Sequence, residues 1–306
     1  MVLGLLAAAA TVVTWTAGTF VFLEAARRIQ PALLNRTRLM LAAVATAVLS
    51  MVVYGMWPHT LLLQPGADSW FWLGMSGLVG LTIGDTFGFS ALRILGARRQ
   101  SVISSVAPVA AAVGGWLLLG EQLTLATLAG MALAIGGVMV AMSGATERSD
   151  VARDGFGSFT TGVVMAVLAA ACQGLGVVLA KRGLAHVEPI HATFMRMSTA
   201  FLLAYVVDVV RRAPIHPMRQ AFADPKGRTA MLLGALFGPI IGVTLSLVAV
   251  RELDSAVAQT LFSMVPLLVM AVAGVRSHEH IPLRAIVGAL IATAGVVVML
   301  LYQHAP

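Results

Sequence analysis

One aspartate, Asp85, stands in a strongly apolar stretch of this sequence, IGDTFGFS, which begins at Ile83. A charged side chain at the centre of a lipid bilayer costs about 2.5–3.5 kcal/mol, so it usually faces a water-filled cavity or a partner of opposite charge. Asp85 could therefore bind a cation or carry a proton along a pathway through the membrane. The alternative is a structural ion pair with Arg38 or Arg93 near the end of a span.

Two later segments share a stripe of polar residues that leads to a proline. The stripe consists of Ser101, Ser105 and Pro108 in one segment and of Gln259, Ser263 and Pro266 in the other. Their spacing of i, i+4 and i+7 places the three positions on one face of a helix. Proline kinks a helix and frees carbonyl groups toward a cavity. We expect the polar residues to bind substrate and the prolines to act as hinges; a permanent kink for packing is the alternative.

Four more side chains in apolar segments are candidates for substrate contact. They are Thr14, Trp15, Gln173 and Thr244. Trp15 and Gln173 occupy equivalent places in two copies of a repeat described below, so an aromatic surface in one copy would face an amide in the other. Such a pair suits an organic solute, and ordinary hydrogen bonding between helices is the alternative.

Two arginines, Arg38 and Arg196, each begin an apolar segment at equivalent places in the two copies. Long basic side chains near span ends usually extend to the membrane interface. Anchoring at the interface is therefore the first interpretation, and binding of an anionic substrate is the second.

Residue patterns for catalysis or metal binding are weak. The run HEH at His278–His280 lacks the one-turn spacing of a zinc-binding helix, and no phosphate loop, nucleophile elbow or His/Cys cluster is found. The sequence therefore predicts no cofactor, no metal, no catalytic residue and no enzyme. Glu121 and Glu279 fall in tight turns, where we expect them to cap helices or to pair within loops.

The composition predicts an all-α polytopic membrane protein. The chain has 306 residues, of which 59% are hydrophobic and 11% charged, with a mean hydropathy of +0.91; soluble domains are about 45–50% apolar and about 25% charged. A span needs about 20 apolar residues, and we predict ten. They are 3–23, 38–57, 69–90, 101–119, 124–142, 159–180, 193–210, 229–249, 255–273 and 284–302.

The net charge of +7 does not indicate nucleic-acid binding, because the arginines sit in short turns between spans. The one cysteine, Cys172, allows no intramolecular disulfide. The first segment lacks a basic region before its apolar run, so we expect a retained span rather than a cleaved signal.

The chain is a tandem repeat with an offset of 158 residues, which aligns glycine, proline, arginine and glutamate positions in one register. We predict a first repeat at 1–142, a linker at 143–158 and a second repeat at 159–306. Because each repeat has five spans, the second must enter the membrane from the opposite side, an arrangement typical of secondary transporters. Sixteen Lys and Arg residues follow odd-numbered spans and four follow even-numbered ones, which predicts that both termini lie outside.

The second part of each repeat carries a recognisable pattern. SSVAPVAAAVGGWLLLGEQLTLATLAGMALAIGGVMV in the first copy and FSMVPLLVMAVAGVRSHEHIPLRAIVGALIATAGVVVML in the second, with VTWTAGTFVF, Pro31 and Arg38 near the start, resemble the EamA type of the drug/metabolite transporter superfamily. The resemblance implies ten helices in two inverted five-helix repeats around a central cavity, which move metabolites or drugs. Many members are expected to have cytoplasmic termini, and the charges here favour the reverse.

These observations together predict a secondary transporter, more specifically an exporter, of small organic metabolites or drugs in the cell membrane (inner or plasma membrane). It would work by alternating access, with hairpins of spans 3–4 and 8–9 as gates and proton coupling through Asp85 as a hypothesis. The expected partners are a small-molecule substrate and the lipid bilayer; monomer and homodimer both stay open. An uncoupled facilitator or a lipid-moving protein of the same fold is the first alternative, followed by a membrane enzyme and by a structural or signalling protein.

Overall fold

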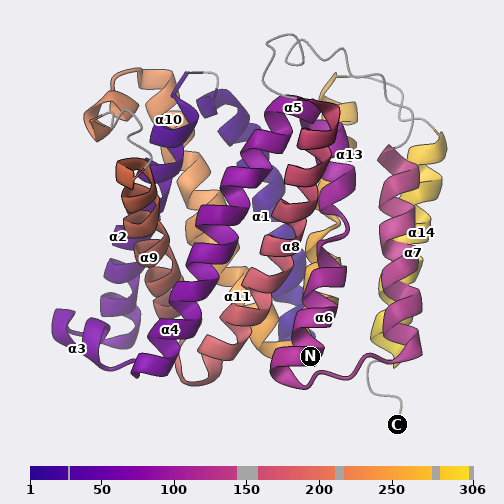
Figure 1. Cartoon of the computed structure of the whole chain (residues 1–306), viewed down its shortest axis with the longest axis horizontal. Coiled ribbons are helices and arrows are strands. Elements are labelled where there is room, and N and C mark those ends of the chain that lie inside the picture. Colours follow the sequence, from indigo (N-terminus) through magenta and orange to yellow (C-terminus); the bar gives the residue numbers. More distant parts are fainter. Residues whose placement is uncertain (27, 143–157, 211–216, 278–282, 303–306) are drawn as a thin grey trace. The chain divides into compact units, whose positions relative to one another are not determined.

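The computed structural model describes residues 1–26, 28–142, 158–210, 217–277 and 283–302, and all regular structure within these ranges is helical (Figure 1). The elements are α1 (Val2–Ala26), α2 (Pro31–Tyr54), α3 (Pro58–Leu63), α4 (Ala67–Ser76), the π-helix η1 (Gly77–Gly84), α5 (Asp85–Ser104), α6 (Ala107–Leu119), α7 (Leu125–Met142), α8 (Phe159–Gly183), the 3-10 helix η2 (Leu184–His186), α9 (Pro189–Val210), the 3-10 helix η3 (Met218–Phe222), α10 (Pro225–Ala235), the π-helix η4 (Leu236–Gly242), α11 (Val243–Glu252), α12 (Ser255–Phe262), α13 (Val265–Ser277) and α14 (Leu283–Tyr302).

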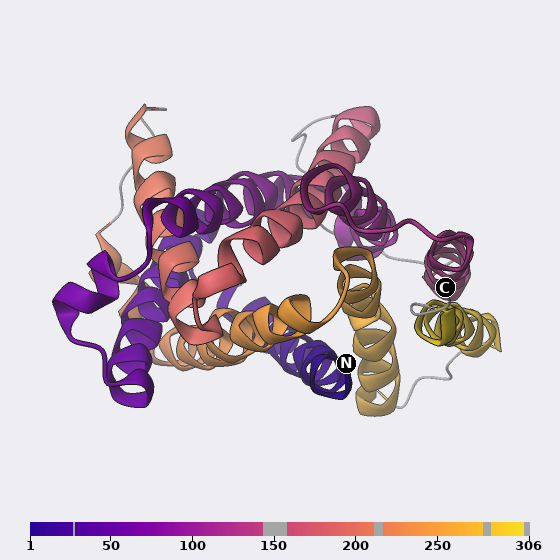
Figure 2. The same ribbon diagram turned by 90° about the horizontal axis from the view of Figure 1, so that it is seen from below.

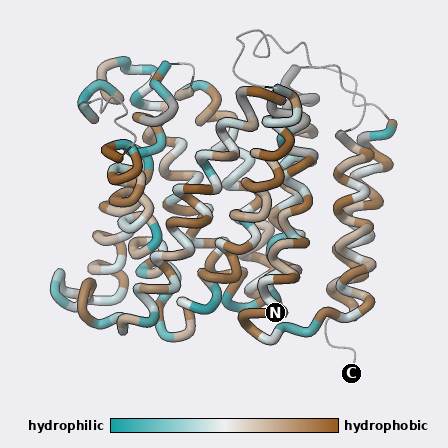
Figure 3. Tube along the Cα trace, viewed as in Figure 1, coloured by the Kyte–Doolittle hydropathy of each residue, from teal (hydrophilic) through white to brown (hydrophobic). Residues whose placement is uncertain are grey.

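The predicted polytopic helical architecture is confirmed. Among the described residues, six segments are long and apolar enough to cross a membrane: Val2–Ala26, Leu33–Tyr54, Phe159–His186, Pro189–Val210, Pro225–Glu252 and Ser255–Val272. Shorter apolar helices cover Ala107–Leu119, Leu125–Ala141 and Ile286–Leu301. The remaining predicted span, 69–90, falls on α4, η1 and the start of α5. Hydrophobic residues follow the length of these helices, and hydrophilic residues collect near helix ends (Figure 3).

The helices form two compact units, each described here by itself. Unit 1 comprises Met1–Leu78 and Leu179–Glu252, and unit 2 comprises Val79–Val178 and Leu253–Pro306. Each unit therefore contains segments from both predicted halves of the chain, including pairs of helices that are equivalent in the repeat. The linker predicted at 143–158 lies almost wholly outside the described residues.

In unit 2, α7 packs side by side with its equivalent helix α14 (Figures 1 and 2). A Cβ added at Gly130 would lie 2.5 Å from the Gly295 carbonyl oxygen, and one at Gly137 would lie 2.6 Å from that of Gly288. Residue numbers thus rise along α7 while they fall along α14, so the two helices are antiparallel. Glycine is needed because only a missing side chain lets two helix backbones approach this closely.

In unit 1, α2 and its equivalent α9 are antiparallel as well. Near the start of α2, Arg36 Nη1 lies 3.3 Å from Asp208 Oδ2 near the end of α9. At the opposite end, His191 Nε2 near the start of α9 lies 2.8 Å from the carbonyl oxygen of Leu61, in the short α3 that follows α2. Two antiparallel pairs of equivalent helices confirm that the repeats are inverted.

Both repeats are distorted at the same places. The π-helices η1 and η4 occupy equivalent residues, and η4 contains Pro239. The helical backbone is also interrupted at 105–106, between α5 and α6, and at the equivalent 263–264, between α12 and α13. Each interruption comes just before a predicted hinge proline, whose ring cannot be accommodated in a regular helix interior.

One turn predicted from the sequence takes a different form. The residues between predicted spans 69–90 and 101–119 belong to the continuous helix α5. This helix must bend back on itself, because the Gln100 amide nitrogen lies 4.0 Å from a Cβ built at Gly88, whereas twelve residues of straight helix span about 18 Å. The equivalent segment breaks between α11 and α12, where Asp254 has an extended backbone and is the N-cap residue of α12.

Candidate functional site

The predicted site residues fall in both units. Unit 1 holds Thr14, Trp15, Arg38, Arg196 and Thr244, and unit 2 holds Asp85, Ser101, Ser105, Pro108, Gln173, Gln259, Ser263 and Pro266. That all of them line one pathway stays a prediction.

In unit 1, the half-buried Trp15 lies against the junction of η4 and α11. A Cβ added at Gly242 would lie 2.5 Å from the indole Nε1 of Trp15. One turn further along α1, a Cβ at Gly18 would lie 3.5 Å from the backbone nitrogen of Gly238. Small residues on both helices therefore seat the indole directly on the distorted segment of the second repeat.

Two hydroxyl groups join α9 to α11 close to the same junction. Thr193 Oγ1 and Thr244 Oγ1 are 3.0 Å apart. Thr244 Oγ1 is also 2.6 Å from the carbonyl oxygen of Ile240, and Thr193 Oγ1 is 2.8 Å from that of Pro189. Because each hydroxyl has one proton, the two cannot bond to each other while both donate to their own helices. The pair can thus exchange donors or turn toward a polar solute.

Thr14, by contrast, bonds within its own helix. Its hydroxyl donates to the carbonyl oxygens of Ala10 at 2.9 Å or Thr11 at 3.0 Å. The hydrogen bonding of Thr14 is therefore local to α1, and its contact with substrate stays a prediction.

The two predicted interface arginines differ in their surroundings. Arg38 Nε donates to Asn35 Oδ1 at 2.8 Å, and its guanidinium carbon lies 5.5 Å from the centre of the Phe22 ring. Arg196 is only 6% exposed, and a Cβ added at Gly77 would lie 2.6 Å from its carbonyl oxygen. Arg38 is partly exposed at its helix start, whereas Arg196 is buried in the packed interior of unit 1.

Unit 1 also contains a buried ion pair that the sequence did not reveal. The side chains of Arg36 and Asp208 are 4% and 20% exposed, and Arg36 Nε and Nη2 make no hydrogen bond. The available signal was Asp208, an acidic residue within a predicted span. Its partner could not be named without the pairing of α2 and α9.

In unit 2, the half-buried Asp85 is the first residue of α5 and directly follows η1. A Cβ at the preceding Gly84 would lie 3.0 Å from Cys172 Cβ of α8, so the helices are in close contact there. In the second repeat the equivalent position after η4 is Val243, which is 8% exposed. An acidic side chain therefore follows the π-helix η1 of the first repeat but not the equivalent π-helix η4 of the second.

The predicted polar stripes are largely buried. Ser105, Gln259 and Ser263 are 2%, 6% and 8% exposed, and Ser263 Oγ donates to the carbonyl oxygen of Thr260 at 2.7 Å. Pro108 is buried and Pro266 is half-buried. The side chain of Ser101 lies outside the described part.

Gln173 is exposed on α8. The next residue, Gly174, holds α8 against α6, because a Cβ there would lie 2.7 Å from the backbone nitrogen of Ala111. A polar amide therefore stands beside a rigid helix contact in unit 2.

Of the two expectations for Glu121, capping of a helix and pairing within a loop, the structure shows the capping contact. The backbone N–H of Ser255, at the start of α12, donates to both carboxylate oxygens of Glu121 at 3.1 and 3.0 Å, and Ser255 Oγ lies 2.9 Å from Oε1. Gly115 makes room, since a Cβ there would lie 3.0 Å from Glu121 Cδ. Glu279 and the HEH run lie outside the described residues.

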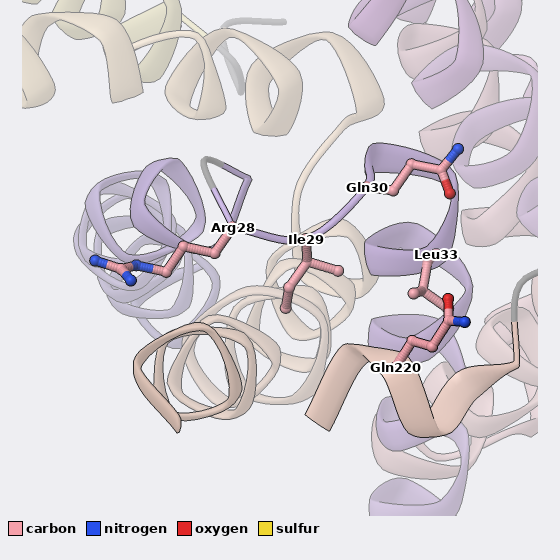
Figure 4. Close-up of a pocket in the computed structure, with 5 residues that line it drawn as sticks. All are labelled: Arg28, Ile29, Gln30, Leu33 and Gln220. Atoms are coloured by element: carbon pink, nitrogen blue, oxygen red, sulfur yellow. The ribbon is translucent and has the colours of Figure 1, made fainter. Parts of the chain in front are cut away.

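A pocket of about 310 Å³ lies in unit 1 where the α1–α2 turn meets η3, and the sequence did not predict it (Figure 4). Its lining consists of Arg28, Ile29, Gln30, Leu33 and Gln220. Figure 4 shows the two amide groups on the side of Leu33, whereas the Arg28 side chain extends away from them.

The Arg28 guanidinium instead bonds to Glu24 Oε1 at 2.6 Å and to Asp224 Oδ2 at 3.4 Å. Hydrogen bonding to Glu24 raises the pKa of Arg28. Within the described residues, no group of three or more His, Cys, Asp or Glu side chains is placed to hold a metal ion.

Comparison with known proteins agrees with this arrangement. The model of the EamA-like transporter family matches residues 2–143 and again residues 160–301. Among solved structures, 29 chains match. One of them, described as "Crystal structure of protein", has a TM-score of 0.74 and 17% identity, with 98% of this chain and 97% of that chain covered; at this identity the match shows the fold alone. No curated protein matches the chain.

Proposed function

Since the chain belongs to the EamA-like transporter family, we propose that it is a secondary transporter that exports small organic metabolites or drugs by alternating access. This family consists of multi-pass membrane transporters of the drug/metabolite superfamily. The proposal rests on that membership. We place it in the inner or plasma membrane.

The observation that carries the proposal is the pair of equivalent distortions with unequal chemistry. π-helices occur often at functional sites, because they interrupt the regular hydrogen-bond ladder. Here η1 leads into Asp85, whereas η4 leads into Val243 and packs against Trp15. We propose that Asp85 binds a cation or carries a proton, and that Trp15 offers an aromatic surface to an organic solute.

The interruptions before Pro108 and Pro266 support a moving part. Both fall at the same place in their repeats, at 105–106 and 263–264. A helix that is already interrupted can change direction there without breaking further backbone bonds. We propose these two points as the hinges of the hairpin gates.

Charge distribution in unit 1 supports an orientation. One end of the unit is formed by the α1–α2 turn, the end of α9, η3 and the start of α10. Its described charged residues are Arg28, Arg36, Arg38, Arg219, Lys226, Arg228, Glu24, Asp208 and Asp224. We propose that this basic end of unit 1 faces the cytoplasm, with the start of α1 outside; that both termini lie outside stays a prediction from the charge count over the whole sequence.

The first experiment is a thermal-stability screen of the purified protein against amino acids, nucleosides, sugars and cationic drugs. A ligand that binds the folded state alone raises apparent stability. Transport of each hit is then measured in proteoliposomes with and without an imposed proton gradient, for the wild type, Asp85→Asn and the control Asp68→Asn. Asp68 is an acid at the start of α4 whose Oδ1 accepts from Trp72 Nε1 at 2.9 Å.

We expect Asp85→Asn to lower gradient-driven accumulation of the ligand by about tenfold or more, while exchange of bound ligand persists. The control should match the wild type. Gradient-driven transport that survives Asp85→Asn with its pH dependence intact would exclude coupling through Asp85. Transport by the wild type that ignores the gradient would instead favour an uncoupled facilitator, and movement of lipid alone would favour a lipid-moving protein.

A further inference from the structure

The buried guanidinium of Arg36 has one edge in use and one edge free. Nη1 lies 3.3 Å from Asp208 Oδ2, while Nε and Nη2 are buried and make no hydrogen bond. Nε–H and the adjacent N–H of Nη2 point in parallel, so together they form the edge by which arginine holds two oxygens of a carboxylate or phosphate. Buried donors in proteins are almost always satisfied, which makes this free edge informative.

A pocket is lined by Leu33, which lies one helical turn from Arg36 along α2. Leu33, part of the lining described above, precedes Arg36 by three residues and therefore lies on the same face of α2, one turn nearer the helix start. Gln30 and Gln220 also line the pocket, and the Gln220 amide lies beside Leu33 (Figure 4). These amides offer further donors, and Leu33 and Ile29 offer apolar surface for a carbon skeleton.

The surrounding charge favours an anion. At this end of unit 1 the described charged side chains are Arg28, Arg36, Arg38, Arg219, Lys226, Arg228, Glu24, Asp208 and Asp224. Asp208 balances Arg36, and Glu24 and Asp224 balance Arg28. The remaining basic residues leave a positive field, which raises the local concentration of anions.

We infer that Arg36 is an oxyanion-binding residue, which takes a carboxylate or phosphate group on its Nε–Nη2 edge through the pocket lined by Leu33. The ligand displaces the Leu33 side chain to reach the edge. Arg36 keeps its contact with Asp208 through Nη1, so the pair holds the guanidinium in a fixed orientation. The same chemistry can come from a soluble solute or from the headgroup of an anionic lipid.

The test compares Arg36→Lys with the control Arg228→Lys, which changes a basic residue at the same end of unit 1 that does not line the pocket. Lysine keeps the charge and can still pair with Asp208, but it lacks the two parallel donors of the guanidinium. Thermal stability of the detergent-purified protein is measured with benzoate, inorganic phosphate and a short-chain alkyl phosphate, each against chloride at equal ionic strength. This readout is binding, so its result does not depend on whether the protein transports anything.

We expect the wild type and Arg228→Lys to be stabilised by at least one oxyanion, with an apparent affinity roughly tenfold higher than that of Arg36→Lys. Equal affinity in Arg36→Lys would overturn the inference. If Arg36→Lys fails to fold, Asp208→Asn replaces it: the edge stays intact and a nearby negative charge disappears, so binding should become tighter. Weaker or absent binding in Asp208→Asn would contradict the assignment.

The source of the oxyanion is settled in nanodiscs. Stabilisation by soluble oxyanions in discs of phosphatidylcholine alone assigns the edge to a solute. Stabilisation only in discs that contain phosphatidylglycerol, and lost in Arg36→Lys, assigns it to a lipid headgroup. If neither condition separates the wild type from Arg36→Lys, the edge binds no oxyanion and the inference fails.

Discussion

The α7–α14 pair of unit 2 and the α2–α9 pair of unit 1 each join a helix to its own copy, but they keep the repeat symmetry to different degrees. In α7–α14, the contact of Gly130 with Gly295 is repeated by that of Gly288 with Gly137, as an offset of 158 requires. In α2–α9, the ion pair at one end has no counterpart, because the equivalent residues are Phe194 and Ser50.

The difference follows from what each contact needs. A glycine contact between backbones works in the same way at either side of a membrane, so both copies can keep it. A charged pair near a helix end depends on which side it faces, because basic residues collect on one side only. Symmetric contacts in this fold therefore indicate a packed scaffold, and broken symmetry indicates positions where function or orientation has selected the residue.

The substitution with the largest expected effect is Gly137→Leu, in the symmetric α7–α14 contact. The new side chain would meet the backbone of Gly288 and Ala292, so α7 and α14 would have to separate. We expect a loss of about 3 kcal/mol in the free energy of unfolding, the upper end for overpacking. The adjacent Gly136→Leu is the control, since a Cβ there has open space. Unfolding in SDS checks both, and equal losses would show that the close contact does not hold the pair together.

The asymmetric pair is tested by Asp208→Leu, alone and combined with Arg36→Met. Loss of the acid alone leaves a buried, uncompensated arginine. Because Asp208 is 20% exposed, we expect about 2 kcal/mol, between the effects of exposed and fully buried pairs. The double variant should recover most of it. Ser50→Ala, at the position equivalent to Asp208, should cost little, since its hydroxyl bonds to Thr46 in the same helix.

If the double variant is no more stable than Asp208→Leu, the ion pair is not the source of the loss. The same unfolding measurement decides this. A full recovery would also show that stability does not require the charges, which would leave their retention to orientation or to ligand binding.

The sequence predicted the symmetric features of this fold well. The glycines of α7 and α14 and the prolines in the first turns of α6 and α13 were visible as one repeat register, and an odd number of spans required inversion. These features are periodic or repeated, so a single sequence carries them twice. For Glu121, capping was one of two alternatives predicted from its place in a tight turn, and its contact with Ser255 is of that kind.

The asymmetric features were mostly missed. The Arg36–Asp208 pair joins residues far apart in the chain, and only the packing of α2 on α9 brings them together. The bend within α5 was predicted as a loop, because its arginines suggested a turn while its helix-forming residues kept the backbone helical. The π-helices η1 and η4 were not predicted from the sequence, although Pro239 within η4 disfavours a regular helix there. The sequence indicated single candidate residues of the functional site, but not which other side chains contact them, because those contacts depend on how the helices pack.

The substitution with the smallest expected effect on stability is Thr193→Val in unit 1. Its hydroxyl lies 3.0 Å from that of Thr244, and the equivalent residues in the first repeat are Asn35 and Thr86, so this contact is asymmetric but uncharged. Hydrogen bonds between membrane helices contribute about 0.6 kcal/mol on average, and we expect a loss of that size on unfolding in SDS. Thr229→Val is the control, because its hydroxyl bonds to the Pro225 carbonyl within its own helix at 3.0 Å. A loss no larger than that of the control would show that the two hydroxyls do not stabilise the α9–α11 contact, and asymmetry in unit 1 would then reside in its charged residues alone.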